Sequence, residues 1–344
     1  MLFKNKKLLV GLIIIIAIIA VFWQINYQRK EKTNSGFRNE CLKENEEASY
    51  EIKEKKRSLG DSEAVATIFI KDKNMNIIKR SFKIDNVWRV ADPIEIHKCG
   101  VYVIRLFNYD PNKTKQDIGY RDEIWRYNYG GSGTSFILLS EKPKEFVSYY
   151  SPIFRVSPDE KYIVLEKGYL GQEDYSLVIK DLKTKENVFV LSANSISKKY
   201  PNIVGVFDLL NWSDNNRYFW GSISEGAYVN GYFRIDTQNW KTDIFEAPDG
   251  AMGGSDLNIN TGYLTIQPGQ VWTGFSDIEE ELKAQYKKEG KKSSLYIYNL
   301  FTKEKLLVAE TEEPLWWFEA KWISDTELEY ELPTGEKEIY KIKE

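Results

Sequence analysis

The sequence has little histidine and little cysteine: one His and two Cys occur among its 344 residues. A serine hydrolase triad would need His97 as its base, and residues 130–134 (GGSGT), which begin like a serine elbow, end in threonine instead of glycine. His97 and Cys99 alternate onto one face of a strand, but no further His or Cys lies nearby to complete a tetrahedral metal site. We therefore expect no catalytic triad, no metal and no cofactor.

The sequence also lacks an excess of positive charge in its folded part. Residues 1–60 carry 12 basic and 7 acidic residues, whereas the rest of the chain carries 36 basic and 44 acidic residues. Neutralisation of phosphates by Lys and Arg supplies most of the affinity of proteins for nucleic acids. An acidic folded part without a basic stripe therefore argues against nucleic acid as the partner.

Long apolar runs are absent except near the N-terminus. Three lysines precede residues 8–23, which hold no charge and would cover about 24 Å as a helix. With Trp23 and Tyr27 as interfacial anchors, residues 1–27 are predicted to be a single-pass transmembrane anchor that contacts the lipid bilayer through residues 8–23. No small residues that suit cleavage follow, so we expect an uncleaved anchor. The domain is expected on the outer side of the plasma (inner) membrane; a tethered cytosolic domain is the alternative.

Residues 28–63 are dense in charges of both signs and cannot bury much apolar area. They are predicted to form a stalk, helical from about residue 39 to 57, that spaces the domain from the bilayer. Cys41 lies in this stalk, and Cys99 lies in the domain. The two could pair only if the stalk folded back, and two cysteines in an exported chain are weak evidence for a bridge. We therefore leave them unpaired.

From residue 64 onward, short apolar runs alternate with turn residues, and one complete unit occupies residues 154–192. It contains two hairpins, one turning at residues 157–160 (SPDE) and one at residues 181–185 (DLKTK). The second turn recurs at three other places, and successive spacings are 53, 55 and 63 residues between Asn128, Asp181, Asp236 and Asn299. A four-stranded unit that recurs at this period is typical of a β-propeller blade.

The unit resembles the blades of TolB-like and WD-like propellers. The resemblance rests on residues 157–162 (SPDEKY) and 178–185 (VIKDLKTK), which are similar to the family's SPDGKY and YVMDLKTG, with Glu160 in place of the turn glycine. It implies an all-β fold: a single propeller over residues 64–344 with about five four-stranded blades, six being the alternative. We expect an early strand, within residues 64–84, to complete the last blade and close the ring.

One helix is predicted inside the domain. Residues 276–279 (SDIE) form a capping box, and basic residues lie at the other end of the segment, before Gly290. Ile278, Leu282 and Tyr286 are four residues apart and form a narrow apolar stripe. We expect this stripe to pack on its own blade.

The longest connections between predicted strands share one face of the expected propeller, and long connections often carry function because the fold does not require them. Ligand contacts are predicted on this face at four aromatic residues: Tyr120, Tyr169, Trp272 and Trp316. The predicted function is that of a non-catalytic, membrane-anchored binding or scaffold protein of the cell envelope, whose partner is a protein or a cell-wall polymer. The alternative is a glycan hydrolase or lyase that uses carboxylates in the propeller channel.

Overall fold

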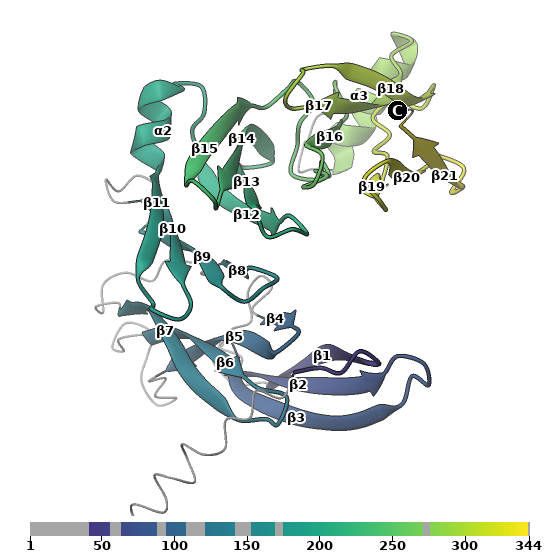
Figure 1. Cartoon of the computed structure of the whole chain (residues 1–344). Helices are drawn as coiled ribbons and strands as arrows, with labels where there is room; N and C mark the ends of the chain where they lie inside the picture. Colours follow the sequence, from purple (N-terminus) through teal and green to yellow (C-terminus); the bar gives the residue numbers. More distant parts are fainter. Residues whose placement is uncertain are drawn as a thin grey trace, which may run out of the picture. The chain divides into compact units, whose positions relative to one another are not determined.

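A computed structural model describes residues 41–55, 63–87, 94–107, 121–141, 153–168, 175–270 and 276–342. The chain divides into two compact units, residues 1–151 and residues 152–344, where the sequence predicted one domain over residues 64–344. We call them unit 1 and unit 2 and describe each separately. Both consist mainly of antiparallel strands (Figure 1).

Unit 1 holds one seven-stranded antiparallel sheet. Its strands are β1 (Glu46–Lys55), β2 (Glu63–Asp72), β3 (Ile78–Val87), β4 (Ile94–His97), β5 (Gly100–Phe107), β6 (Arg121–Tyr127) and β7 (Gly133–Glu141). They lie in the order β1-β2-β3-β5-β6-β7, and β4 pairs with β5. Every second residue of β2 from Ala64 to Ile70 is fully buried, so one face of the sheet carries the core of this unit.

The predicted helical stalk is wrong for residues 46–55, because this segment is strand β1. It pairs with β2 over its whole length, from Glu46 opposite Asp72 to Lys55 opposite Glu63. Ala48 and Ile52 alternate onto one face and pack against the core. The high charge content conceals this period of two, because the charged residues of an edge strand can occupy its other face.

Cys41 and Cys99 form a disulfide, which corrects the expectation that they stay unpaired. The segment before β1 returns to the turn between β4 and β5, where the amide of Leu42 donates a hydrogen bond to the carbonyl of Lys98 over 2.8 Å. The expectation assumed that residues 28–63 stand away from the domain. Pairing of β1 with β2 places residues 46–55 on the sheet of this unit, and the short segment before β1 then brings Cys41 to Cys99.

Unit 2 holds four successive antiparallel sheets and two helices. The sheets are formed by β8 (Phe154–Val156), β9 (Tyr162–Lys167), β10 (Ser176–Asp181) and β11 (Asn187–Ser192); by β12 (Val206–Trp212), β13 (Tyr218–Glu225), β14 (Tyr228–Asp236) and β15 (Lys241–Glu246); by β16 (Tyr263–Ile266), β17 (Ser293–Asn299) and β18 (Lys305–Thr311); and by β19 (Lys321–Trp322), β20 (Glu327–Glu331) and β21 (Lys337–Lys341). The helices are α2 (Ala193–Lys199) and α3 (Ser276–Lys288). The hairpin turns predicted at Asp181, Asp236 and Asn299 all join neighbouring strands here.

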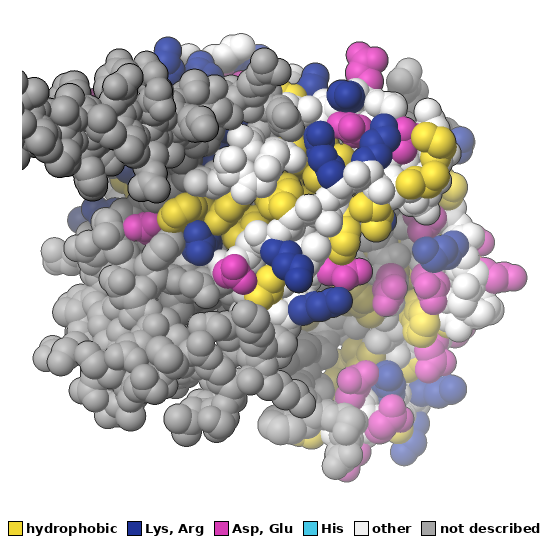
Figure 2. Space-filling view, turned by 90° about the horizontal axis from the view of Figure 1, so that it is seen from below, with side chains coloured by type: hydrophobic (Ala, Val, Ile, Leu, Met, Phe, Trp, Pro, Cys, Tyr) yellow, Lys and Arg dark blue, Asp and Glu magenta, His cyan; other side chains and the backbone are white. Residues whose placement is uncertain are grey.

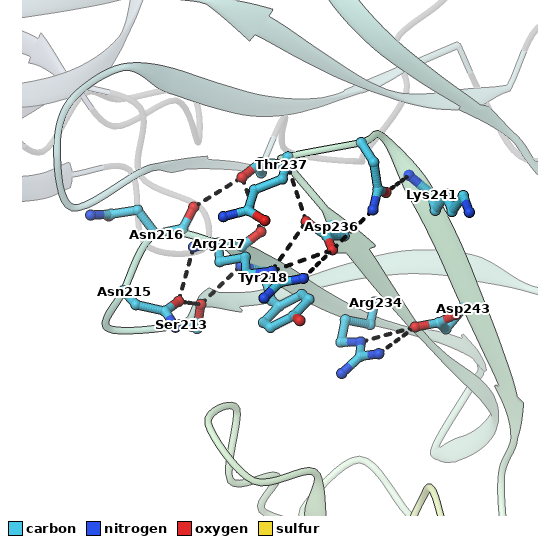
Figure 3. Close-up of polar contacts among 12 residues, drawn as sticks. Ser213, Asn215, Asn216, Arg217, Tyr218, Arg234, Asp236, Thr237, Lys241 and Asp243 are labelled. Atoms are coloured by element: carbon cyan, nitrogen blue, oxygen red, sulfur yellow. Dashed lines mark hydrogen bonds and ion pairs between the residues drawn. The ribbon is translucent and has the colours of Figure 1, made fainter.

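A serine fixes the first hairpin turn of two of these sheets. The hydroxyl of Ser157 accepts the amide of Tyr162 over 2.9 Å, and that of Ser213 accepts the amide of Tyr218 over 2.9 Å. Each serine hydroxyl also bonds the side chain two residues later, Asp159 in one sheet and Asn215 in the other. Figure 3 shows the second of these turns, with Ser213 and Asn215 side by side.

An Asp or Asn fixes the second hairpin turn in the same way. Its side-chain oxygen accepts the amides two and three residues later, as Asp181 does from Lys183 and Thr184, both over 2.8 Å. Asn299 repeats this contact in the third sheet of unit 2 and Asp72 repeats it in unit 1. In every case the residue four positions on has a positive φ, so the chain reverses within five residues.

The first turns of neighbouring sheets in unit 2 are also linked to one another. The amide of Asp159 donates to the side chain of Asn216 over 3.2 Å. The side chain of Asn260 donates to Asp214 and to Asp325, each over 2.9 Å. These bonds connect turns that lie far apart in the sequence, and they keep the four sheets in succession at this end of the unit.

A strand within residues 64–84 was predicted to close the last sheet, and the structure excludes β2 from this role. Both edges of β2 are occupied, by β1 and by β3, and a strand with both edges paired has no free backbone groups to add to another sheet. The other edge of β3 pairs with β5 only at Val87, opposite Arg105. The sheet of β19, β20 and β21 has three strands among the residues that the structure describes. Closure by the first part of β3 therefore stays a prediction.

Helix α3 forms where the capping box predicted it. Of the predicted apolar stripe, Leu282 and Tyr286 are half-buried, whereas Ile278 is 51% exposed. The stripe is therefore covered only toward the C-terminal end of the helix.

The turn glycine that Glu160 replaces gives a first prediction. Glu160 has φ +55°, a left-handed conformation that costs a residue with a Cβ roughly 1–2 kcal/mol. Glu160→Gly should therefore raise the free energy of unfolding by about 0.5–1 kcal/mol, as measured by urea denaturation. Lys161→Gly, at a neighbour without a positive φ, should lower it, and a loss of stability in Glu160→Gly would contradict the assignment.

The disulfide gives a second prediction. Cys41 and Cys99 are 58 residues apart, and a crosslink across a loop of that size is worth about 2–4 kcal/mol. The double variant Cys41→Ser/Cys99→Ser should lose this much stability, and reduction of the wild-type chain should reproduce the loss. Two free thiols in the unreduced, denatured wild-type chain would contradict the pairing.

Candidate functional site

Unit 2 contains a cavity of about 180 Å³ beside helix α2. One part of its wall is the segment between β11 and β12, which includes α2. The rest comes from Tyr175, just before β10, from Phe207 on β12 and from Ile223 on β13. The lining residues are Tyr175, Ala193, Asn194, Ile196, Ser197, Ile203, Val204, Gly205, Phe207 and Ile223. Most of these side chains are apolar, and Tyr175, Asn194 and Ser197 supply the polar groups.

The backbone around Gly205 is shaped by a close approach of two segments. Gly205 has φ +139°, and a Cβ at this position would lie 2.1 Å from the carbonyl oxygen of Ser224 on β13. Only glycine fits there. This lets the chain pass directly from the cavity wall into β12 and positions Phe207 in the wall.

Tyr175 connects the cavity to a pair of acidic residues. Its ring lines the cavity, and its hydroxyl accepts a hydrogen bond from the amide of Phe207 over 2.8 Å. The same hydroxyl hydrogen-bonds the carboxyl group of Glu166 on β9. The tyrosine therefore holds Glu166 next to the cavity wall.

Glu166 carries an unusual proton affinity. Its half-buried position raises the pKa of its carboxyl group, and the charge of Asp208 raises it further, to about 8, against the opposing effect of the Tyr175 hydrogen bond. The ordinary pKa is near 4.5. Glu166 is therefore mostly protonated and neutral at pH 7, so it can donate a hydrogen bond or a proton.

Asp208 lies on the edge strand β12 among hydroxyl groups. Its carboxylate accepts hydrogen bonds from Ser224 and, over 3.3 Å, from Ser222 on the neighbouring strand β13. Burial first, and then the charge of Asp208, raises the pKa of Tyr232 well above its usual range. Hydroxyl donors therefore hold the Asp208 side chain in place, where it contributes to the raised pKa of both Glu166 and Tyr232.

This arrangement suits the binding of an uncharged or weakly polar group. The cavity offers mainly apolar side chains, and Tyr175, which lines it, hydrogen-bonds the carboxyl group of Glu166 behind it. Glu166 and Asp208, which we call the acid pair, place a carboxyl group with a raised pKa near a second carboxyl group.

The structure describes one of the four residues predicted to contact a ligand, and all four contacts stay predictions. Tyr120, Tyr169 and Trp272 lie outside the described residues. Trp316 is half-buried and packs against the core of the last two sheets, and its indole NH donates to the carbonyl of Glu331 over 3.3 Å. It does not line the cavity.

Residues 192–202 form a long connection that contains α2 and supplies four of the ten residues that line the cavity. The acid pair was not predicted from the sequence. The alternation of side chains in a strand could have indicated Glu166, because it follows the buried Val164 by two residues and so occupies a core-facing position of β9.

His97 and Cys99 serve structural roles. Cys99 is in the disulfide, and His97 contacts the carboxylate of Glu95 over 3.1 Å while its ring packs on the edge of Tyr102. Among the described residues, no helix is both long and apolar enough to cross a membrane, and residues 8–23 lie outside them.

The raised pKa of Glu166 gives a third prediction. Between pH 4.5 and about 8 the folded chain binds a proton at Glu166 that the unfolded chain has released, so stability should fall as the pH rises through this window. Glu166→Gln should remove this part of the pH dependence in thermal melts recorded from pH 5 to 9. Glu186→Gln, in the exposed turn between β10 and β11, is the control and should keep it. Parallel curves for wild type and Glu166→Gln would contradict the shift.

Comparison with solved structures returns β-propeller domains. The β-propeller domain of the trilobed protease from Pyrococcus furiosus aligns over 86% of this chain and 77% of its own, with 12% identity and a TM-score of 0.43. TolB from Acinetobacter baumannii aligns over 86% and 79%, with 11% identity and a TM-score of 0.33. The acylaminoacyl peptidase of Pyrococcus horikoshii aligns over 83% and 41%, with 10% identity and a TM-score of 0.44. No family model and no curated protein matches the sequence. The chain is similar in structure to β-propeller domains, with several antiparallel sheets that match theirs.

Proposed function

We propose that this chain is a membrane-anchored binding protein of the cell envelope, and that the cavity beside α2 receives part of a protein ligand. Residues 8–23 would hold the chain in the plasma membrane, with the folded units on its outer side. The ligand would be a peptide segment of an envelope protein, and a cell-wall polymer is the other partner considered.

The cavity beside α2 is the observation that carries this proposal. An apolar cavity of about 150 Å³ can hold a benzene ring, so the volume here, about 180 Å³, suits one aromatic or aliphatic side chain. Val204 at the wall is 43% exposed, and Asn194 is also exposed, so the wall is continuous with the surface. Asn194, Ser197 and Tyr175 offer groups that can bond a peptide backbone.

A second candidate function follows from the acid pair. A glycan hydrolase needs one protonated carboxyl group and one carboxylate beside the scissile bond. Glu166 has a pKa of about 8, and Asp208 lies close enough for its charge to contribute to that value. This observation favours a carboxylate-dependent hydrolase or lyase over other enzyme classes.

A methyl NMR titration of the full chain distinguishes the two functions. N-acetyl-phenylalaninamide should shift the methyl resonances of Ile196, Ile203 and Ile223, because these residues line the cavity. N-acetylglucosamine should leave them unchanged if the ligand is a peptide. An oligomer of N-acetylglucosamine that is cleaved by the wild type but not by Glu166→Gln would instead support the second candidate.

A matched pair of variants locates the binding. Val204→Trp adds bulk at the cavity wall and should weaken binding of the peptide probe about tenfold or more, because it fills space that the probe needs. Val190→Trp, at an equally exposed residue of β11 that does not line the cavity, should bind as the wild type does. If neither probe moves the three methyl resonances at millimolar concentration, a ligand site in this cavity is contradicted.

A further inference from the structure

We propose that the turn between β2 and β3 in unit 1 inserts into the headgroup layer of the bilayer, and that anionic lipid is its ligand. This turn comprises residues 73–78, and we call it the hairpin tip. The inference rests on the membrane anchor proposed above, and it adds a second point of contact with lipid.

The hairpin tip exposes three large apolar side chains next to one another. Met75 is 61% exposed, Ile77 58% and Ile78 51%. Hydrophobic side chains do reach the surface elsewhere among charged ones (Figure 2). At the tip, however, three of them fall within four residues of one turn, at the end of two long strands (Figure 1).

The turn geometry does not require these apolar residues. Asp72, Asp181 and Asn299 begin the same turn. In each case the amide of this residue donates to the carbonyl of the residue five positions later, and its side-chain oxygen accepts the amide two positions later. At the position of Met75 the other two turns carry Thr184 and Thr302. At the position of Ile77 they carry Glu186 and Glu304. Two exposed positions are therefore polar in the turns at Asp181 and Asn299 but apolar in the turn at Asp72. This difference indicates that the apolar residues contact something outside the fold.

Two basic side chains beside the tip, Lys71 and Lys73, are available to an anionic surface, because Lys79 and Arg80 face the buried carboxylates of Asp72 and Glu46. Residues 71–80 contain four basic residues and one acidic residue. The acidic residue, Asp72, is buried and already paired with Lys79 over 2.8 Å, while Arg80 lies 3.6 Å from the buried Glu46. Apolar side chains flanked by Lys and Arg are the pattern of segments that lie in a membrane interface.

The chain arriving from the predicted anchor reaches unit 1 beside this tip. The amide of Lys73 donates to the carbonyl of Asn45 over 2.9 Å, and its ammonium group donates to the carbonyl of Glu44 over 3.1 Å. The side chain of Asn45 donates to Asp72. The tip therefore lies beside residues 44 and 45, close to where the described part of the chain begins.

A fluorescent probe at the tip tests the contact in the full chain. Because Cys41 and Cys99 are paired, Met75→Cys provides a single reactive thiol for the dye NBD. In nanodiscs of mixed phosphatidylglycerol and phosphatidylcholine, emission should shift to shorter wavelength, and spin-labelled lipid should remove about half of its intensity. Nanodiscs of phosphatidylcholine alone should give a smaller effect, because the basic flanks then lose their partner.

Thr302→Cys is the matched control, since it occupies the same position of the same turn in β17–β18. Its probe should be unaffected by spin-labelled lipid. Equal quenching at both positions, or quenching at neither while the protein stays with the discs, would overturn the inference and leave the anchor intact.

If residues 8–23 do not anchor the chain in the bilayer, the protein will not co-elute with the nanodiscs. This result is distinct from the loss of quenching at the hairpin tip. In that case flotation with phosphatidylglycerol vesicles decides: Met75→Ser/Ile77→Ser/Ile78→Ser should bind at least about tenfold more weakly than wild type. Equal binding would overturn the inference. Because Met75, Ile77 and Ile78 are exposed, the triple variant should keep the melting temperature of the wild type. An unchanged melting temperature shows that the variant is folded.

Discussion

The fold depends on one kind of interaction: a side-chain oxygen that accepts backbone amides inside a hairpin turn. Ser157 and Asp181 do this in the first sheet of unit 2, and equivalent residues do it in the sheets that follow. Because side chains in a strand alternate between faces, a shift of one residue in a hairpin would turn every core residue outward. The turns therefore decide which residues face the core, and they place Glu166 on the same face as Val164.

Hairpins were predictable from the sequence because their turn residues act locally. Asp181, Asp236 and Asn299 need only the next few residues to form their bonds, so a short motif is sufficient to identify them. Strand β1 was not predictable in the same way. Its ten residues are mostly charged, and their pairing with β2 depends on a partner about seventeen residues away. The disulfide followed from that pairing and was missed with it.

The same distinction between local and long-range signals applies to the candidate site. The connection at residues 192–202 can be recognised from its length alone, because the hairpins do not need it. The acid pair brings together residues from β9 and β12, about forty positions apart, and no local motif records that proximity. Trp316 contributes to a core that two sheets share, and its predicted ligand contact stays a prediction. Large aromatic side chains serve packing and binding equally well, and composition does not separate the two.

Two places in the described chain combine a residue type and an environment that do not suit each other. Glu166 is an acidic residue at a core-facing position, and Met75, Ile77 and Ile78 are exposed apolar residues at and next to a turn whose equivalents carry polar residues. The first carries a cost of desolvation, and the second a cost of exposed apolar surface. Sequences that are otherwise consistent with their structure tend to make such exceptions where function requires them. The cavity wall and the hairpin tip are therefore the parts of this chain where a ligand is to be sought.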